Sequence, residues 1–227
     1  MLKRMIPAIF ILAVSFNCYS QTGKPDFKEI EKAIADKNSP FFYTPLMKRY
    51  TNNDTSLTLT ELRYLYYGFS FQDSYSPYGS SAVKDELKKS ITAGETDKII
   101  ELEKKVLTEF PFNLRNLNAL VNVLDKKGDT AASNMYYKKL INLCKAILST
   151  GDGASDSTAI YVISVEHEYD LIGLLGFEFG GSQALVYGKS GPMDKMKLKK
   201  NDDNIDYLYF NVDRLFASME KMFKKKK

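Results

Sequence analysis

Residues 95–149 read ETDKIIELEKKVLTEFPFNLRNLNALVNVLDKKGDTAASNMYYKKLINLCKAILS, and this stretch decides the fold of the larger part of the chain. Its apolar residues recur every three or four positions, which is the spacing of one face of a helix. Pro111 separates a first helix from a second, Gly128 separates the second from a third, and Gly151 follows the third. Because proline and glycine end helices, the stretch predicts three amphipathic helices joined by short turns.

Helix start signals recur upstream of this stretch. Thr58 and Glu61 stand three residues apart, the spacing of a capping box, and Gly68 is expected to end the helix that they begin. Further helices are expected after Pro25 and around Pro45. Ser80 or Ser81 is expected to cap another helix, which carries Val83, Leu87 and Ile91 at a spacing of four.

The composition changes after Gly151, where β-branched and aromatic runs replace the helical pattern. Strands are expected at 159–165, 183–187, 193–198 and 206–212, with a helix at 168–175 and a final helix from Asp213. The fold class predicted is α+β, in which a mostly helical N-terminal two-thirds packs on a small C-terminal sheet with a terminal helix. The predicted organisation is a signal peptide at 1–20, a helical region at 21–150, an α+β region at 151–223 that shares one core with it, and a basic tail at 224–227.

The helical region resembles a tetratricopeptide unit. Two predicted antiparallel helices meet at Gly128 and Asp129, and a preceding helix ends at Pro111-Phe112-Asn113. The resemblance extends over about one and a half repeats, and it implies a layer of helix hairpins.

The N-terminus has the order of a signal peptide. Lys3 and Arg4 precede an apolar run from Ile6 to Phe16, and Ser20 provides a small residue before Gln21. As a helix the run spans only about 17 Å, too short for a hydrocarbon core of about 30 Å. Cleavage between Ser20 and Gln21 therefore predicts a periplasmic or secreted protein without a transmembrane segment. The alternative is a lipoprotein that is cleaved before Cys18 and tethered by its lipid.

Charge and cysteine content exclude several classes of protein. The formal charge is +4 and falls by two with the loss of Lys3 and Arg4, too near neutrality to indicate nucleic acid as a partner. Cys144 is the one cysteine after the signal peptide, so no intramolecular disulfide forms. No phosphate-binding or dinucleotide-binding glycine pattern is present. A zinc site would need more histidine or cysteine ligands than His167 and Cys144 supply, so neither a metal nor a cofactor is expected.

A concentration of aromatic residues runs from Tyr64 to Tyr78. Tyrosine suits ligand surfaces because it offers a broad apolar face and one hydroxyl group. The ligand-binding candidates in this run are Tyr67, Phe71, Tyr75 and Tyr78. The alternative is that the rings are core residues, since a helix that is aromatic on most faces is often buried. Tyr75 and Tyr78 belong to a predicted loop, where an exposed ring is expected.

His167 and Glu168 are the remaining site candidates. A histidine beside a carboxylate has the composition of a general base and its orienting partner. An enzyme would need His167 together with Glu168 or Asp194 in one cleft. The alternative is a structural or surface histidine, because neighbours in sequence point in different directions.

Several strings resemble the signature of a secreted-protein family of the Bacteroidetes that is described as a domain of unknown function. The strings are Leu62 to Phe69, Phe71-Gln72, Ser76-Pro77-Tyr78, His167-Glu168-Tyr169, Gly176, Gln183-Ala184-Leu185, and Tyr209-Phe210 with Asp213. The resemblance implies export and a helical-plus-sheet architecture over essentially the whole mature chain. It brings no activity, cofactor or catalytic residue.

The function favoured by the sequence is an exported binding or interaction module with a tyrosine-rich contact loop. A protein or a glycan of the cell envelope is the expected partner. The alternatives are a subunit of an envelope assembly and a hydrolytic enzyme centred on His167. The sequence does not decide whether the chain is an enzyme, but it favours the binding role.

Overall fold

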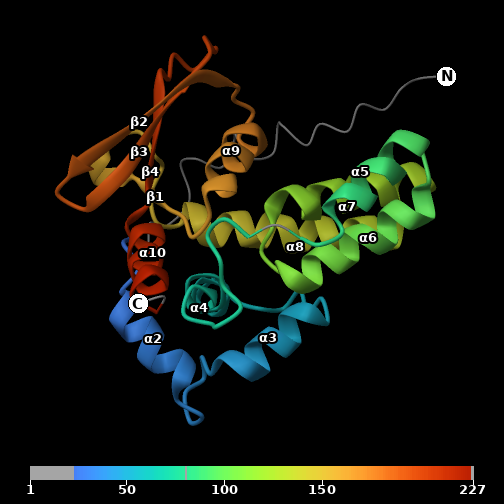
Figure 1. Ribbon diagram of the computed structural model, residues 1–227, viewed down its shortest axis with the longest axis horizontal. Helices are drawn as coiled ribbons and strands as arrows, with labels where there is room; N and C mark the ends of the chain where they lie inside the picture. Colours follow the sequence, from blue (N-terminus) through green and yellow to red (C-terminus); the bar gives the residue numbers. More distant parts are fainter. Residues whose placement is uncertain (1–22, 80, 226–227) are drawn as a thin grey trace. The chain divides into compact units, whose positions relative to one another are not determined.

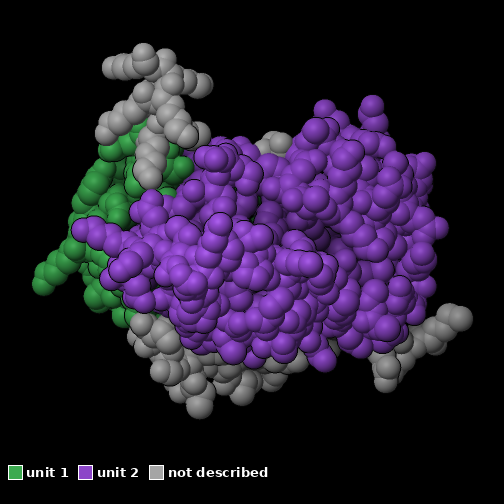
Figure 2. Space-filling model, turned by 90° about the horizontal axis from the view of Figure 1, so that it is seen from below, with its two compact units in different colours: residues 1–24, 148–227 green, residues 25–147 purple. Residues whose placement is uncertain are grey.

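The computed structural model describes residues 23–79 and 81–225, and the predicted signal peptide, Cys18 included, lies outside them. Two compact units divide the chain, one formed by residues 25–147 and one that includes residues 148–227 (Figure 2). Helices make up the first unit, and the second adds a four-stranded mixed sheet, so the fold class is α+β. Within the described residues, no helix is both long enough and apolar enough to cross a membrane.

The helical unit contains the helices α2 to α8 of Figure 1. Their bounds are α2 Phe27–Ala35, α3 Tyr43–Thr51, α4 Leu59–Phe69, α5 Lys84–Ala93, α6 Thr96–Glu109, α7 Leu114–Lys127 and α8 Thr130–Leu148. Helices α2 and α3 both pack against α4, while α5 packs against α6 and α6 against α7. The three helices predicted from residues 95–149 are therefore α6, α7 and α8.

Local capping explains where α4 and α7 begin and where α7 ends. Thr58 and Glu61 form the predicted capping box of α4, in which the Thr58 hydroxyl accepts from the Glu61 amide at 3.2 Å and a Glu61 carboxylate oxygen accepts from the Thr58 amide at 2.7 Å. The Asn113 side chain caps α7. Gly128 ends α7 with φ +86°, a left-handed conformation that glycine adopts without strain.

Aromatic rings fill the centre of the helical unit. Tyr66 and Tyr67 are fully buried and their ring centroids lie 4.9 Å apart, edge to face. The ring centroid of Phe112 lies 5.8 Å from that of Tyr66 and 5.5 Å from that of Phe69. The aromatic concentration in the sequence therefore serves, in large part, to pack α4 into the core.

The C-terminal unit combines a small sheet with two helices. Its elements are the 3₁₀ turn η1 Asp156–Thr158, β1 Ile160–Tyr161, α9 Val165–Leu174, β2 Phe179–Gly188, β3 Gly191–Leu198, β4 Tyr207–Asn211 and α10 Asp213–Lys225. The strand order is β1-β4-β3-β2, with β1 parallel to β4 and the other pairs antiparallel (Figure 1). Strand β2 is thus an edge strand.

The two faces of this sheet differ in composition. Met196, Leu208 and Phe210 are buried on one face, which also carries Asp194, because alternate residues of a strand share a face. Helix α9 contacts β2 and brings Glu168 against Asp194, so it covers this apolar face. The opposite face carries lysines and tyrosines.

Two expectations from the sequence are corrected. The run from Ala159 to Val165 is a strand only at Ile160–Tyr161, because the chain turns at Ser164 into α9. The apolar residues of this run are buried in the core, but most of them do not pair with another strand. Ile91 is 54% exposed. A spacing of four residues drifts about 40° per step around a helix of 3.6 residues per turn, so Ile91 leaves the face that Val83 and Leu87 bury.

Candidate functional site

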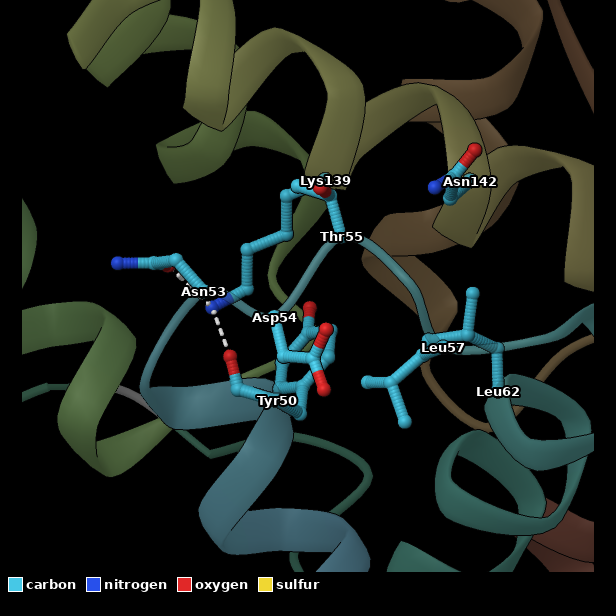
Figure 3. Close-up of a pocket in the computed structure, with 8 residues that line it drawn as sticks. All are labelled: Tyr50, Asn53, Asp54, Thr55, Leu57, Leu62, Lys139 and Asn142. Atoms are coloured by element: carbon cyan, nitrogen blue, oxygen red, sulfur yellow. Dashed lines mark hydrogen bonds between the residues drawn. The ribbon is translucent and has the colours of Figure 1, made fainter.

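Lys139, on α8, is the most unusual cation among the described residues. Its ammonium donates to the Tyr50 carbonyl oxygen at 2.8 Å and to Asn53 Oδ1 at 3.0 Å, and it lies 4.0 Å from the centroid of the Tyr50 ring (Figure 3). The two hydrogen bonds and the ring surround the charge with dipoles and a π face. No carboxylate of the described residues forms an ion pair with it.

The end of α3 builds this arrangement. The helix ends at Thr51, and Asn53 follows in the left-handed region with φ +58°, which asparagine tolerates better than most residues. The Tyr50 carbonyl, in the last turn of α3, accepts from the Asn53 amide at 3.1 Å and also accepts from the ammonium, which the partial negative charge of a helix C-terminus favours. The Tyr50 hydroxyl donates to the Pro111 carbonyl at 3.0 Å, which fixes the ring beneath Lys139.

Burial determines the electrostatics of the lysine. Removal from water disfavours the ammonium form and lowers the pKa of Lys139 to about 8. The nearest acidic side chain in Figure 3, Asp54, does not compensate because it binds Arg49, whose Nε lies 2.7 Å from Asp54 Oδ2. Hydrogen bonds from Ser56 and then from Arg49 lower the pKa of Asp54 to about 2. Lys139 therefore carries a charge without a counter-ion.

A hollow of about 250 Å³ lies beside Lys139, between α3, α6 and α8. It is lined by Tyr50, Thr51, Asn53, Lys104, Leu107, Thr108, Pro111, Tyr136 and Lys139. This lining has two lysines, four residues with hydroxyl groups and no acidic side chain. A second space, of about 10 Å³, shares Tyr50, Asn53 and Lys139 and has room for about one water molecule (Figure 3).

Asn53 links the cation to the wall of the hollow. Its Oδ1 accepts from Lys139, and its side chain also hydrogen bonds with Tyr136, one turn before Lys139 on α8. Burial raises the pKa of the Tyr136 hydroxyl, and the bond from Asn53 lowers it in part. The chemistry offered to a ligand is thus one of donors and positive charge, which suits an anion.

The aromatic candidates occupy contrasting positions. Tyr67 is fully buried in the core, and Phe71 is partly buried. Tyr75 is only 9% exposed and packs edge-on against Phe69 at 5.7 Å, so the expectation that its ring is exposed is wrong. Tyr78 is 62% exposed. Tyr75 lies in a loop, but its ring packs inward because it contacts the ring of Phe69.

The structure brings Glu168 and Asp194 together in the C-terminal unit. Glu168 is fully buried, and neither of its carboxyl oxygens accepts a hydrogen bond from a described donor. Burial, and then the adjacent Asp194 carboxylate, raise the pKa of Glu168 to about 9. The neutral acid therefore predominates at pH 7 and donates its proton to Asp194.

Asp194 connects this acid pair to the surface. Gln183 Nε2 donates to Asp194 Oδ2 at 2.7 Å, and the Tyr169 hydroxyl donates to Gln183 Oε1 at 2.6 Å. His167 is 5% exposed on the same helix as Glu168, one residue earlier. Because Glu168 is fully buried, Asp194 is the member of the pair that a solute reaches.

Within the described ranges, no group of three or more histidine, cysteine, aspartate or glutamate side chains is arranged to hold a metal ion. Cys144 is 1% exposed on the inner face of α8. Neither region therefore offers the ligand set of a zinc site.

Sequence reasoning missed Lys139. The signal that identifies it is its place on α8, three residues after Tyr136 and four before Leu143, at the border of the apolar stripe. A lysine at such a border reaches along the helix surface toward whatever acceptor its neighbours provide. The acceptor, the end of α3, lies 89 residues away in sequence, so pattern alone does not reveal it.

Comparison with protein families supports one part of the resemblance noted in the sequence, the domain of unknown function. The helical unit and the unit with the four-stranded mixed sheet define the class as α+β. The family model described as "Domain of unknown function (DUF4919)" matches residues 28–221, and the chain belongs to this family. Neither a curated protein nor a solved structure matches the chain.

Proposed function

We propose that this protein is an exported binding module that takes an organic anion into the hollow beside Lys139. The observation that carries the proposal is the buried ammonium without a carboxylate partner, next to a space whose lining holds a second lysine and no acidic residue. Its desolvation corresponds to at most about 3 kcal/mol, and a bound anion would recover part of it.

The lining also bounds the chemistry of the ligand. Leu107, Pro111 and the Tyr50 ring supply apolar surface, while Lys139, Lys104 and Tyr136 supply the cations and the hydroxyl group. A volume of about 250 Å³ lies at the small end of ligand sites. The proposed ligand is therefore a small carboxylate with an apolar body.

Titration calorimetry of residues 21–227 tests this proposal. The probes are benzoate, acetate, glutamate and inorganic phosphate, and we expect benzoate to bind most tightly because it joins a carboxylate to an apolar ring. At 100 times its Kd, a ligand adds about 2.7 kcal/mol to the free energy of unfolding, which a thermal shift also detects.

Two lysine variants decide the result. Lys139→Met is expected to abolish binding, whereas Lys105→Met, at an exposed neighbour of Lys104 on α6, is expected to leave it unchanged. Binding that survives Lys139→Met, or an absence of binding by all four probes, would overturn the proposal.

Tyr78 remains the proposed contact of the tyrosine-rich loop, for a protein or glycan of the cell envelope. Its 62% exposure supports this role, while the burial of Tyr75 supports a structural one. Tyr78→Ala is expected to weaken capture of envelope material without changing the urea midpoint. Tyr75→Ala is expected to lower that midpoint. The reverse pattern would remove Tyr78 from the proposal.

Export itself is part of the proposal and rests on the N-terminal sequence. Mass spectrometry of the protein recovered from its native host tests it. The expected mature N-terminus is Gln21. A mature chain that begins at a lipid-modified Cys18 would place the protein on a membrane instead, and an intact N-terminus would refute export by this route.

A further inference from the structure

One face of the C-terminal sheet carries an ordered set of basic and aromatic side chains that the Lys139 site does not use. In the β3–β4 register, Lys195 pairs with Tyr209 and Lys197 pairs with Tyr207. All four lie on the face opposite Asp194, Met196 and Phe210, so α9 does not cover them. Lys197 is exposed, and the other three are partly buried.

The side chains on this face already interact as cation and ring. The Lys195 ammonium lies 4.1 Å from the Tyr207 ring centroid and 5.5 Å from that of Tyr209. Met193, farther along the same face, is fully buried, so the exposed part is the Lys195–Lys197 end. The two tyrosines form one row on β4 and the two lysines form a parallel row on β3.

At the Lys195–Lys197 end of this face the charge of the strand positions has one sign, whereas Asp156 and Asp213 lie at the other end, near Gly188 and Gly191. The neighbouring β2 positions on the same face, Ala184 and Val186, are uncharged. Glu178, just before β2, is bound by Lys199 at 2.6 Å. Asp194 and Asp206 directly precede Lys195 and Tyr207 in sequence, and the alternation of side chains places Asp194 on the opposite face. An anionic partner at the Lys195–Lys197 end therefore meets two ammonium groups, and no neighbouring strand position on that end of the face carries a carboxylate.

We propose that this face binds an acidic polysaccharide, a chain of uronic acid units, lying along the strands. Alternate residues of a strand are about 6.8 Å apart and neighbouring strands about 4.8 Å, so the face offers a row of rings beside a row of cations. The apolar faces of sugar rings stack on tyrosine, and the uronate carboxylates reach the lysines. A neutral glycan would use only the first row.

Two cations are few for a nucleic acid, whose affinity grows with the number of phosphates neutralised. The nearly neutral charge of the mature chain argues in the same direction. Nucleic acid is therefore an outcome of the test and not part of the proposal.

The test is binding of oligogalacturonate to residues 21–227 by calorimetry, with maltooligosaccharide and a single-stranded DNA oligonucleotide as comparison probes. We expect oligogalacturonate to bind, the neutral glycan to bind at least about tenfold more weakly, and the affinity to fall with added salt. The double variant Lys195→Gln/Lys197→Gln is expected to lose about tenfold or more. The matched control is Lys189→Gln/Lys200→Gln, which removes two exposed lysines outside the rows.

A ring variant separates stacking from charge. Tyr209→Ser is expected to weaken binding, and Tyr209→Phe is expected to retain it, because the ring and not the hydroxyl makes the contact. Circular dichroism of both variants shows whether the sheet remains folded, and the lysine variants keep the test decisive if Tyr209→Ser unfolds. Equal losses in the two lysine pairs, equal binding of DNA, or no binding of oligogalacturonate would each overturn the proposal.

Discussion

The helical unit and the C-terminal unit each hold an ionisable side chain whose pKa is strongly shifted by burial, Lys139 and Glu168, and the two side chains respond differently. The Lys139 ammonium contacts a carbonyl oxygen, an amide oxygen and an aromatic ring, none of which carries a full negative charge. Glu168 lies against a second acid, Asp194, and holds a proton instead of a charge. In both cases burial is the main cause of the shifted pKa. A buried ionisable group can keep its charge beside dipoles, as Lys139 does, or take the neutral protonated form, as Glu168 does. Only the charged group can attract a ligand of opposite charge.

The largest effect is expected where the helical unit positions its charge. Tyr50→Ala removes the ring beneath Lys139 and its bond to Pro111, and it opens a cavity beside Phe112. We expect a loss of about 3–5 kcal/mol in the free energy of unfolding, measured by urea denaturation. The matched change in the C-terminal unit, Tyr187→Ala, removes a ring that is 76% exposed and is expected to cost at most about 0.5 kcal/mol. Similar losses in the two variants would contradict the assignment of Tyr50 to the core.

The acid pair predicts a descending dependence of stability on pH. The pKa of Glu168 is about 9 in the folded chain and 4.5 ordinarily. Between these values the folded state binds a proton that the unfolded state lacks, so the free energy of unfolding falls as pH rises. The slope is at most about 1.4 kcal/mol per pH unit. Glu168→Gln keeps the shape and donates to Asp194 without titrating, so it is expected to flatten the profile between pH 5 and 8 in urea titrations at each pH. A control at the exposed Asp203, Asp203→Asn, is expected to keep the slope.

The buried amine of Lys139 predicts that, at higher pH, the free energy of unfolding rises with pH instead of falling. The pKa of Lys139 is about 8 in the folded chain and 10.5 ordinarily. Between these values the unfolded state binds the proton that the folded state lacks, so stability rises with pH. Lys139→Met is expected to remove this rise, and Lys105→Met is expected to preserve it, in the same urea titrations. If the rise persists without Lys139, the amine is not desolvated as its surroundings imply.

The smallest effect is expected at Ile91, whose exposure marks it as a surface residue of α5. Ile91→Ser is expected to change the free energy of unfolding by less than about 0.5 kcal/mol in thermal denaturation. Leu87→Ser, one turn earlier on the buried face, serves as the contrast and is expected to cost several times more. Equal costs would place Ile91 in an interface.

Local signals predicted much of the architecture. The Thr58–Glu61 capping box and the glycine stop at Gly128 act within one or two turns, so their residues suffice to predict them. The strands after Gln183 followed the alternation of their side chains. The helix expected around Pro45 is α3, which begins at Tyr43.

The parts that sequence did not predict depend on contacts between distant residues. Nothing near Lys139 in sequence indicates that its ammonium meets the end of α3, and nothing near Tyr75 distinguishes an exposed loop ring from one that packs on Phe69. Glu168 and Asp194 were both named as candidates, but their contact follows from the fold of α9 over β3. Local rules predict elements, whereas tertiary packing decides which of their polar groups meet.

The buried thiol of Cys144 on α8 is a chemical probe of how often the helical unit opens. A thiol that is 1% exposed is shielded from alkylating reagents until its surroundings open, so the rate of its modification measures how often the helical unit opens. No other cysteine lies within the described residues, so the signal has a single origin in residues 25–147. A ligand bound in the hollow beside Lys139 should slow the modification of Cys144, because a ligand that binds only the closed unit makes its openings rarer.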